Sequence, residues 1–126
     1  MKTIISTKDA PAAIGPYSQA VEAAGFVFIS GQLPVDPATG GMTEADTAGQ
    51  TETVIRNIAA ILAARGLALD NIVKTTVFMT DLREFQKMNE VYARFFAKNP
   101  PARATIEVKA LPKAALVEIE AIAERG

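Results

Sequence analysis

The stretch LVEIEAIA at Leu116–Ala123 decides the fold class, because it alternates with the two-residue period of a half-buried β-strand. Its odd-numbered residues are small or aliphatic, while the acidic residues Glu118 and Glu120 fall on the opposite face. The stretch Ala102–Lys109, which precedes it, alternates in the same way. The C-terminal part of the chain therefore predicts two consecutive strands.

Earlier segments of the chain also have strand character. A segment rich in β-branched residues is typical of a strand. The dipeptide Ala24-Gly25 lies between two such segments and predicts a β-hairpin. The predicted strands are Thr3–Ser6, Tyr17–Glu22, Phe26–Ser30 and Ile72–Met79.

Two stretches have the 3.6-residue period of amphipathic helices. The first is expected to run from Glu44 to Arg65, with Thr43 as its N-cap and Gly66 just past its C-terminus. The second follows Asp81, a capping residue, and ends before Pro100. Its apolar stripe is assigned to the core and consists of Phe85, Met88, Tyr92, Phe95 and Phe96.

The predicted elements follow the order β, β, β, α, β, α, β, β, which indicates an α+β fold with a mixed β-sheet covered on one face by two helices. A length of 126 residues suits one domain, so we expect a single domain over residues 1–126. The uncovered face is expected to carry Arg103, Glu118 and Glu120 among smaller apolar groups. Self-association is the simplest way to bury such a face.

The composition limits the possible chemistry, because the chain contains no cysteine and no histidine. Thiol nucleophiles, Cys/His zinc sites and histidine-based mechanisms are excluded, and we expect a site without metal ion or cofactor. A net charge of −1 and the lack of a basic cluster argue against a nucleic-acid partner. No apolar run approaches the roughly 20 residues of a membrane helix, so we expect no membrane partner and a soluble, cytoplasmic protein.

Two charged residues of the last strands are candidates for chemistry. Arg103 begins its strand, and a planar guanidinium can hold a carboxylate through two hydrogen bonds. The alternative is a solvated or ion-paired arginine, the commoner role of a charge on a strand. Glu118 beside the sheet core could have a raised pKa and carry protons, or it could be a rim carboxylate paired with a lysine. The pattern alone does not separate Glu118 from Glu120.

Two positions next to loops carry polar groups that could contact a ligand. Tyr17 follows the Gly15-Pro16 bend, which would aim its phenol, and the alternative is a buried tyrosine packed against the hairpin. Ser30-Gly31 follows a buried strand, where a hydroxyl and a backbone N–H could bind an oxyanion or an imine nitrogen. The alternative for this dipeptide is a simple strand-ending turn.

Five stretches together carry a family resemblance, although each alone would be a weak signal. They are APAAIGPY at 10–17, ISGQLP at 29–34, VKTTVF at 73–78, PAR at 101–103 and VEIEAIA at 117–123. In this order, and over nearly the whole chain, they resemble the RidA family of reactive intermediate deaminases, also called YjgF-type or L-PSP endoribonuclease-type proteins.

The resemblance implies a chorismate-mutase-like α+β protomer in a homotrimer, with barrel-like sheet packing at its centre and three sites at the subunit clefts. It also implies 2-iminobutanoate/2-iminopropanoate deaminase activity, which hydrolyses a 2-imino acid to a 2-keto acid and ammonia.

The resemblance also assigns roles to individual residues. It implies that Arg103 binds the substrate carboxylate and that Glu118 positions water. The residues that match pocket-lining positions are Tyr17, Ser30, Gly31 and Asn89. Many members have cysteine where this chain has Thr105, so we expect Thr105 in the pocket and no thiol-dependent activity.

Two other functions remain open at this point. A non-catalytic small-molecule-binding trimer, acting as a sensor or in a chaperone-like role, would use Arg103 but would need no chemistry from Glu118. An endoribonuclease or translation inhibitor is the weaker alternative, because the pI is about 5.4 and histidine is absent.

Overall fold

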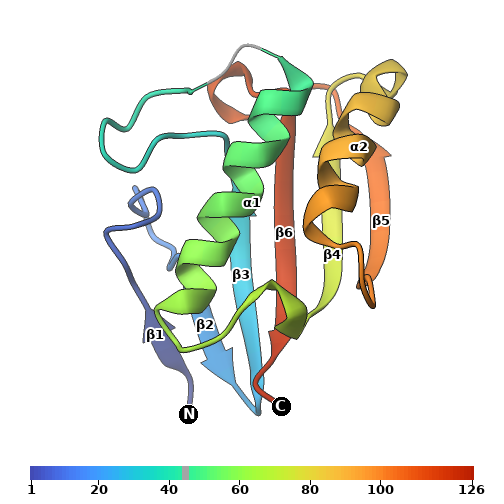
Figure 1. The fold of residues 1–126 in the computed structure, drawn as a ribbon. Helices are drawn as coiled ribbons and strands as arrows, with labels where there is room; N and C mark the ends of the chain where they lie inside the picture. The colour runs from blue at the N-terminus through green and yellow to red at the C-terminus, as the bar shows by residue number, and fades with distance from the viewer. Residues whose placement is uncertain (44–45) are drawn as a thin grey trace.

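The computed structural model describes residues 1–43 and 46–126, which form one mixed sheet with two α-helices on the same face (Figure 1). Within these residues the sheet has six strands in the order β1-β2-β3-β6-β4-β5. Neighbouring strands are antiparallel except β4 and β5, which are parallel. The strands are β1 (Thr3–Ile5), β2 (Ala20–Ala23), β3 (Phe26–Gln32), β4 (Ile72–Met79), β5 (Ala102–Glu107) and β6 (Val117–Glu124). The predicted α+β class is therefore confirmed.

The helices are α1 (Thr47–Ala63) and α2 (Phe85–Phe95), and short 3-10 turns η1 (Leu69–Asn71), η2 (Leu82–Glu84) and η3 (Pro112–Ala114) lie in the connections. The predicted stripes are confirmed, since Ile58 and Leu62 of α1 and Met88 and Tyr92 of α2 are buried in one core with the strands. Burial of these aliphatic and aromatic side chains holds both helices against the sheet. No helix in the described part of the chain has the length and apolar character needed to cross a membrane.

The start of α1 differs from the prediction. The helix begins at Thr47, and Asp46 is its N-cap, with a side-chain oxygen that accepts a hydrogen bond from the Gly49 N–H at 2.8 Å. Thr43, the predicted cap, instead lies 2.9 Å from the hydroxyl of Thr53. A carboxylate caps as well as a hydroxyl does, so the pattern alone could not choose between them. The predicted first residue, Glu44, lies outside the described residues.

The other predicted boundaries are close to the observed ones. The hairpin around Ala24-Gly25 is confirmed, although β2 starts at Ala20 rather than Tyr17. The strand β3 does not end at Ser30 but continues to Gln32, which pairs with Ile119 after an irregularity in the register. Ser30-Gly31 is therefore a bulge inside a strand and not a strand-ending turn.

The register corrects the predicted composition of the uncovered face. Arg103 pairs with Thr75, which pairs in turn with Ala121, so all three side chains lie on the face that carries the helices. Glu118 and Glu120 lie on the uncovered face, as predicted. Arg103 can remain charged on the helix face because β5 is the edge strand, where a long side chain reaches solvent past the helix.

The uncovered face is rich in apolar side chains. Four of its members, from the three strands β1, β3 and β5, are large and exposed, with Ile4 at 62% and Phe28 at 46% exposure. They are Ile4, Phe26, Phe28 and Ile106. Exposed apolar faces of this kind are typical of surfaces that bind a protein, a membrane or a ligand.

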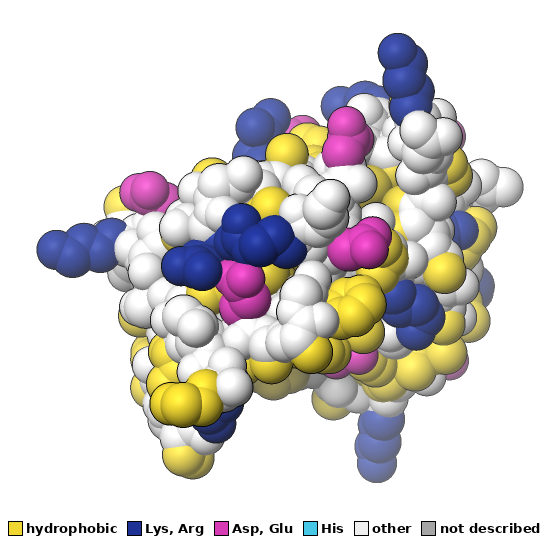
Figure 2. All heavy atoms as spheres, turned by 90° about the horizontal axis from the view of Figure 1, so that it is seen from below, with side chains coloured by type: hydrophobic (Ala, Val, Ile, Leu, Met, Phe, Trp, Pro, Cys, Tyr) yellow, Lys and Arg dark blue, Asp and Glu magenta, His cyan; other side chains and the backbone are white. Residues whose placement is uncertain are grey.

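A group of charges ties together the end of the molecule where both termini lie (Figure 1). Glu22 of β2 accepts hydrogen bonds from Arg65, which follows α1, at 2.8 Å and from Arg125, which follows β6, at 2.7 Å. These hydrogen bonds from Arg125 and Arg65 lower the pKa of Glu22 to about 2. In the view from below, basic and acidic side chains meet at this end (Figure 2).

Candidate active site

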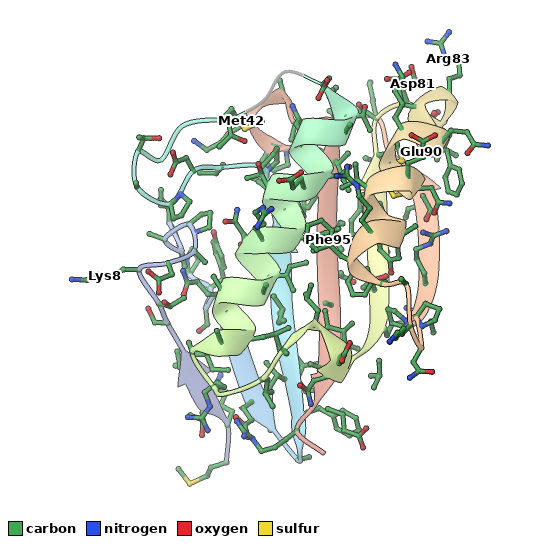
Figure 3. All side chains as sticks on the ribbon, viewed as in Figure 1. Lys8, Met42, Asp81, Arg83, Glu90 and Phe95 are labelled. Carbon is green, nitrogen blue, oxygen red and sulfur yellow. The ribbon has the colours of Figure 1, made fainter. Side chains whose placement is uncertain are left out.

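The helix α2 presents a stripe of three side chains toward the edge strand β5. Its entry is fixed by Asp81, whose carboxylate accepts a hydrogen bond from the Arg83 N–H at 2.9 Å and pairs with the Arg83 guanidinium, as the labelled side chains show (Figure 3). The predicted cap at Asp81 is therefore confirmed, although its helical turn is the short η2 that leads into α2. From this start, the spacing of Phe85, Asn89 and Tyr92 places them on one side of α2.

The guanidinium of Arg103 lies against this stripe. Its Nη1 donates a hydrogen bond to Oδ1 of Asn89 at 2.7 Å. Its Cζ lies 4.6 Å from the ring centroid of Tyr92 and 5.5 Å from that of Phe85, which are cation–π distances. The Tyr92 hydroxyl is fixed in turn by the Thr75 hydroxyl at 2.8 Å. The guanidinium is therefore held in one orientation before any ligand arrives.

The groups that hold Arg103 are all electrically neutral. Within the described residues, no carboxylate lies within salt-bridge distance of this guanidinium. By contrast, Arg56 and Arg65 each have a carboxylate oxygen within 3.0 Å. Arg103 is also exposed, so its charge and its remaining N–H groups can reach an anion from solvent.

Tyr92 belongs to both the core and the support of Arg103. It is buried, and burial raises the pKa of its phenol against the opposing effects of the Thr75 hydrogen bond and the Arg103 charge. The helical pattern of the sequence predicts Tyr92 and Phe85 as core residues, but it does not show that their rings face an arginine. The available signal was the helical spacing of the two aromatic residues around Asn89.

Thr105 lies on the same face of β5 as Arg103, one pleat further along the strand. Its hydroxyl oxygen is covered by protein and has no hydrogen-bond partner in the described part of the chain. A hydroxyl covered in this way does not meet a ligand without a change in its surroundings, and its burial costs stability.

A second group of predicted residues lies around the bulge in β3. The Ser30 hydroxyl donates a hydrogen bond to the Ser18 carbonyl at 2.6 Å. A Cβ added at Gly31 would lie only 2.9 Å from the carboxyl carbon of Glu118, so the Glu118 side chain crosses directly over this glycine. Burial, and to a smaller extent the charge of Glu120, raise the pKa of Glu118 above its ordinary value. Ser30, Gly31 and Glu118 therefore form one cluster.

Tyr17 lies in the loop that enters the sheet beside this cluster. Its N–H donates to the Gly15 carbonyl at 2.9 Å, and the next residue, Ser18, is the partner of Ser30. Its side chain is 54% exposed, so the alternative of a buried, packed tyrosine does not hold.

The structure thus divides the predicted site residues into two groups. Arg103 and Thr105 of the edge strand β5 and Asn89 of α2 lie together on the helix face of the sheet. Glu118 lies on the opposite face, and its strand β6 is separated from β5 by β4. One copy of the chain therefore does not bring Arg103 and Glu118 into one pocket. No group of three or more acidic side chains is placed to hold a metal ion among residues 1–43 and 46–126.

Comparison with known proteins shows which family this arrangement belongs to. The model of the family Endoribonuclease L-PSP matches residues 7–125. The chain belongs to the L-PSP (RidA) family. The resemblance of its five sequence stretches to the RidA family is therefore confirmed, and the fold is that of its relatives.

Individual members of the L-PSP (RidA) family are similar over nearly their whole length. A RutC family protein of Pyrococcus horikoshii is 52% identical over 98% of each chain. The human 2-iminobutanoate/2-iminopropanoate deaminase is 44% identical over 100% of this chain and 92% of the relative. The crystal structure of Escherichia coli TdcF with bound serine has a TM-score of 0.94 and 46% identity, covering 98% of this chain and 99% of TdcF.

Proposed function

We propose that this chain hydrolyses reactive 2-imino acids, of the 2-iminobutanoate and 2-iminopropanoate type, to 2-keto acids and ammonia. The observation that carries the proposal is the guanidinium of Arg103, which is exposed and oriented by neutral groups without a carboxylate partner in the described residues. Such a group suits a ligand carboxylate. The human relative that carries this activity in its name supports the choice of substrate. The serine bound to the TdcF relative carries the same carboxylate group.

The reaction needs orientation, one water molecule and proton transfer. Arg103 holds the substrate carboxylate. Water adds to the carbon of the protonated C=N bond, and Glu118 accepts a proton from that water. The same proton passes to the nitrogen of the resulting carbinolamine. The carbon–nitrogen bond then breaks and ammonia leaves, while Glu118 accepts the hydroxyl proton and the carbon–oxygen double bond of the keto acid forms. We propose that the Ser30 hydroxyl, the Gly31 N–H and the Tyr17 phenol, from the cluster around Glu118 and the loop beside it, contact the reacting groups.

The complete site requires two copies of the chain, because Arg103 and Glu118 lie on opposite faces of the sheet in one copy. We propose that the Arg103 group of one protomer meets the Glu118 group of its neighbour in a homotrimer. The apolar uncovered face, with Phe28 and Ile106, supports this assembly because burying such a face is favourable. Three equivalent boundaries would then hold three sites.

Ammonia release from imine generated in situ by a dehydratase tests the function. Replacing Arg103→Ala is expected to lower kcat/KM by about 100-fold, because a charged partner of the carboxylate is lost. Arg103→Lys keeps the positive charge but loses the planar guanidinium that can make two hydrogen bonds to a carboxylate, so we expect roughly a ten-fold loss of kcat/KM. Unchanged oligomeric state and melting temperature are the controls for folding. Near-normal turnover by Arg103→Ala would refute the proposal that Arg103 binds the substrate carboxylate.

The same assay separates the enzyme from a non-catalytic small-molecule-binding trimer. Glu118→Gln is expected to lower kcat much more than it weakens binding of a 2-keto acid. A protein that only binds would release no ammonia above the uncatalysed rate, and the Glu118→Gln change would have no catalytic effect.

A further inference from the structure

Two kinds of partner hold arginine side chains in the described part of the chain. Arg65 and Arg83 make ion pairs with carboxylates, and these pairs satisfy the cation within the protein. Arg103 is held as closely, at 2.7 Å from its hydrogen-bond partner, but that partner is the amide oxygen of Asn89. The two rings beside it add contact area and an attractive π-face without adding a negative charge.

We propose that Asn89 is a positioning and specificity residue, which orients the Arg103 guanidinium while leaving its charge uncompensated for an anionic ligand. This inference rests on the proposed role of Arg103 in binding the substrate carboxylate. Asn89 acts through Arg103, so the inference differs from the expectation that Asn89 lines the pocket and touches the substrate. The neutral amide is the feature that matters, because it orients the Arg103 guanidinium without cancelling its positive charge.

The choice between amide and carboxylate at position 89 has a clear physical consequence. Asparagine and aspartate have nearly the same shape, and either can accept the hydrogen bond from Nη1 of Arg103. An aspartate would also form an ion pair with the guanidinium and would repel an approaching carboxylate. It would therefore hold the arginine at least as firmly and yet bind the ligand less well.

The experiment compares Asn89→Asp with Asn89→Ala in the full-length assembled protein. Binding of 2-oxobutanoate, a 2-keto acid, is measured by titration calorimetry, and turnover is measured as ammonia release. Asn89→Ala removes the orienting bond and is expected to weaken 2-oxobutanoate binding about three-fold. Asn89→Asp is expected to weaken it about ten-fold and to raise KM by a similar factor while kcat stays within about two-fold. The melting temperature of Asn89→Asp should equal or exceed that of the unchanged protein.

A matched control for the added charge is Gln86→Glu. Gln86 is exposed on the same helix, and the substitution is the same change from amide to carboxylate. We expect Gln86→Glu to change 2-oxobutanoate binding by less than about two-fold, because a solvated surface charge acts weakly.

The rank order of the variants decides the question. A purely structural role for Asn89 predicts that Asn89→Asp, which keeps the hydrogen bond, binds 2-oxobutanoate better than Asn89→Ala. That order would overturn the proposal, as would equal weakening by Gln86→Glu and Asn89→Asp. Failure of the proposed function is distinguishable, because 2-oxobutanoate binding would then be insensitive to Arg103→Ala, whereas failure of this inference alone leaves that sensitivity intact.

Discussion

The separation of Arg103 and Glu118 on opposite faces of one sheet predicts that two inactive variants restore activity when their subunits mix. Arg103→Ala removes one half of the proposed site, and Glu118→Gln removes the other half. Each variant alone is expected to have little activity. In a mixed trimer, a boundary where an intact Arg103 meets an intact Glu118 of the neighbouring protomer regains a complete site.

The size of the recovery follows from counting boundaries. In an equimolar random mixture, the first protomer of a boundary has an intact Arg103 in half of the cases, and its neighbour has an intact Glu118 in half of the cases. About one quarter of all sites are then complete, so we expect about one quarter of the unchanged protein's activity. If both residues acted within one protomer, no protomer in the mixture would be complete and no recovery would occur.

A second mixture gives an independent value with the same assay. The double variant Arg103→Ala/Glu118→Gln is mixed in equal amounts with the unchanged protein. A site shared between protomers is complete in about one quarter of cases, whereas a site within one protomer is complete in about one half. Subunits are exchanged by unfolding and refolding together, exchange is verified by mass spectrometry, and activity is measured as ammonia release.

The outcome that refutes the reasoning is well defined. Activity of about one half in the second mixture, together with no recovery in the first, would assign both residues to the same protomer. The proposed meeting of the two groups across a subunit boundary would then be wrong, even if the chain proves to be an imine deaminase.

Two further predictions concern stability. Because burial and Glu120 raise the pKa of Glu118 above 4.5, the folded chain binds more protons than the unfolded chain between pH 4.5 and the raised value, so stability falls as pH rises through that window. Glu118→Gln should therefore gain in melting temperature relative to the unchanged protein as the pH rises from about 4 to about 8, and a constant difference would contradict this. Thr105→Val replaces the unpartnered buried hydroxyl with a methyl group of similar shape and should raise the free energy of unfolding by about 1 kcal/mol in urea titration. A loss of stability would show that the assembled protein supplies a partner for this hydroxyl.

The fold class was predictable from the sequence because burial leaves a periodic pattern in a chain. The alternation at 116–123 and the helical stripe through Met88 and Tyr92 each mark the side that faces the core, and the structure buries those sides. Helix boundaries were less predictable, as the choice between Thr43 and Asp46 as N-cap shows. Both residues can cap, and the choice depends on where the helix packs in the folded chain.

The face on which Arg103 lies could not be predicted from its own strand. The alternation of 102–109 shows which residues share a face, but it does not show which face meets the helices. That is decided by the parallel pairing of β5 with β4, which brings Arg103 level with the buried Thr75. The arginine then lies under α2, where Asn89 and the aromatic rings contact it. These contacts join segments that only the folded topology brings together.

Gly31 illustrates the same limit at the other half of the proposed site. Sequence rules associate such a glycine with a turn, but Gly31 lies inside β3 and its backbone needs no left-handed conformation. The absent side chain is needed for space, because a Cβ would lie 2.9 Å from the carboxyl carbon and 3.2 Å from Cγ of Glu118. A glycine at this bulge therefore leaves room for the Glu118 side chain on β6, the neighbouring strand of the sheet. Residue 31 is a glycine because the Glu118 side chain occupies the space that a Cβ would need, and not because its own strand requires a special backbone conformation. The requirement therefore follows from the position of Glu118, the residue proposed to transfer protons.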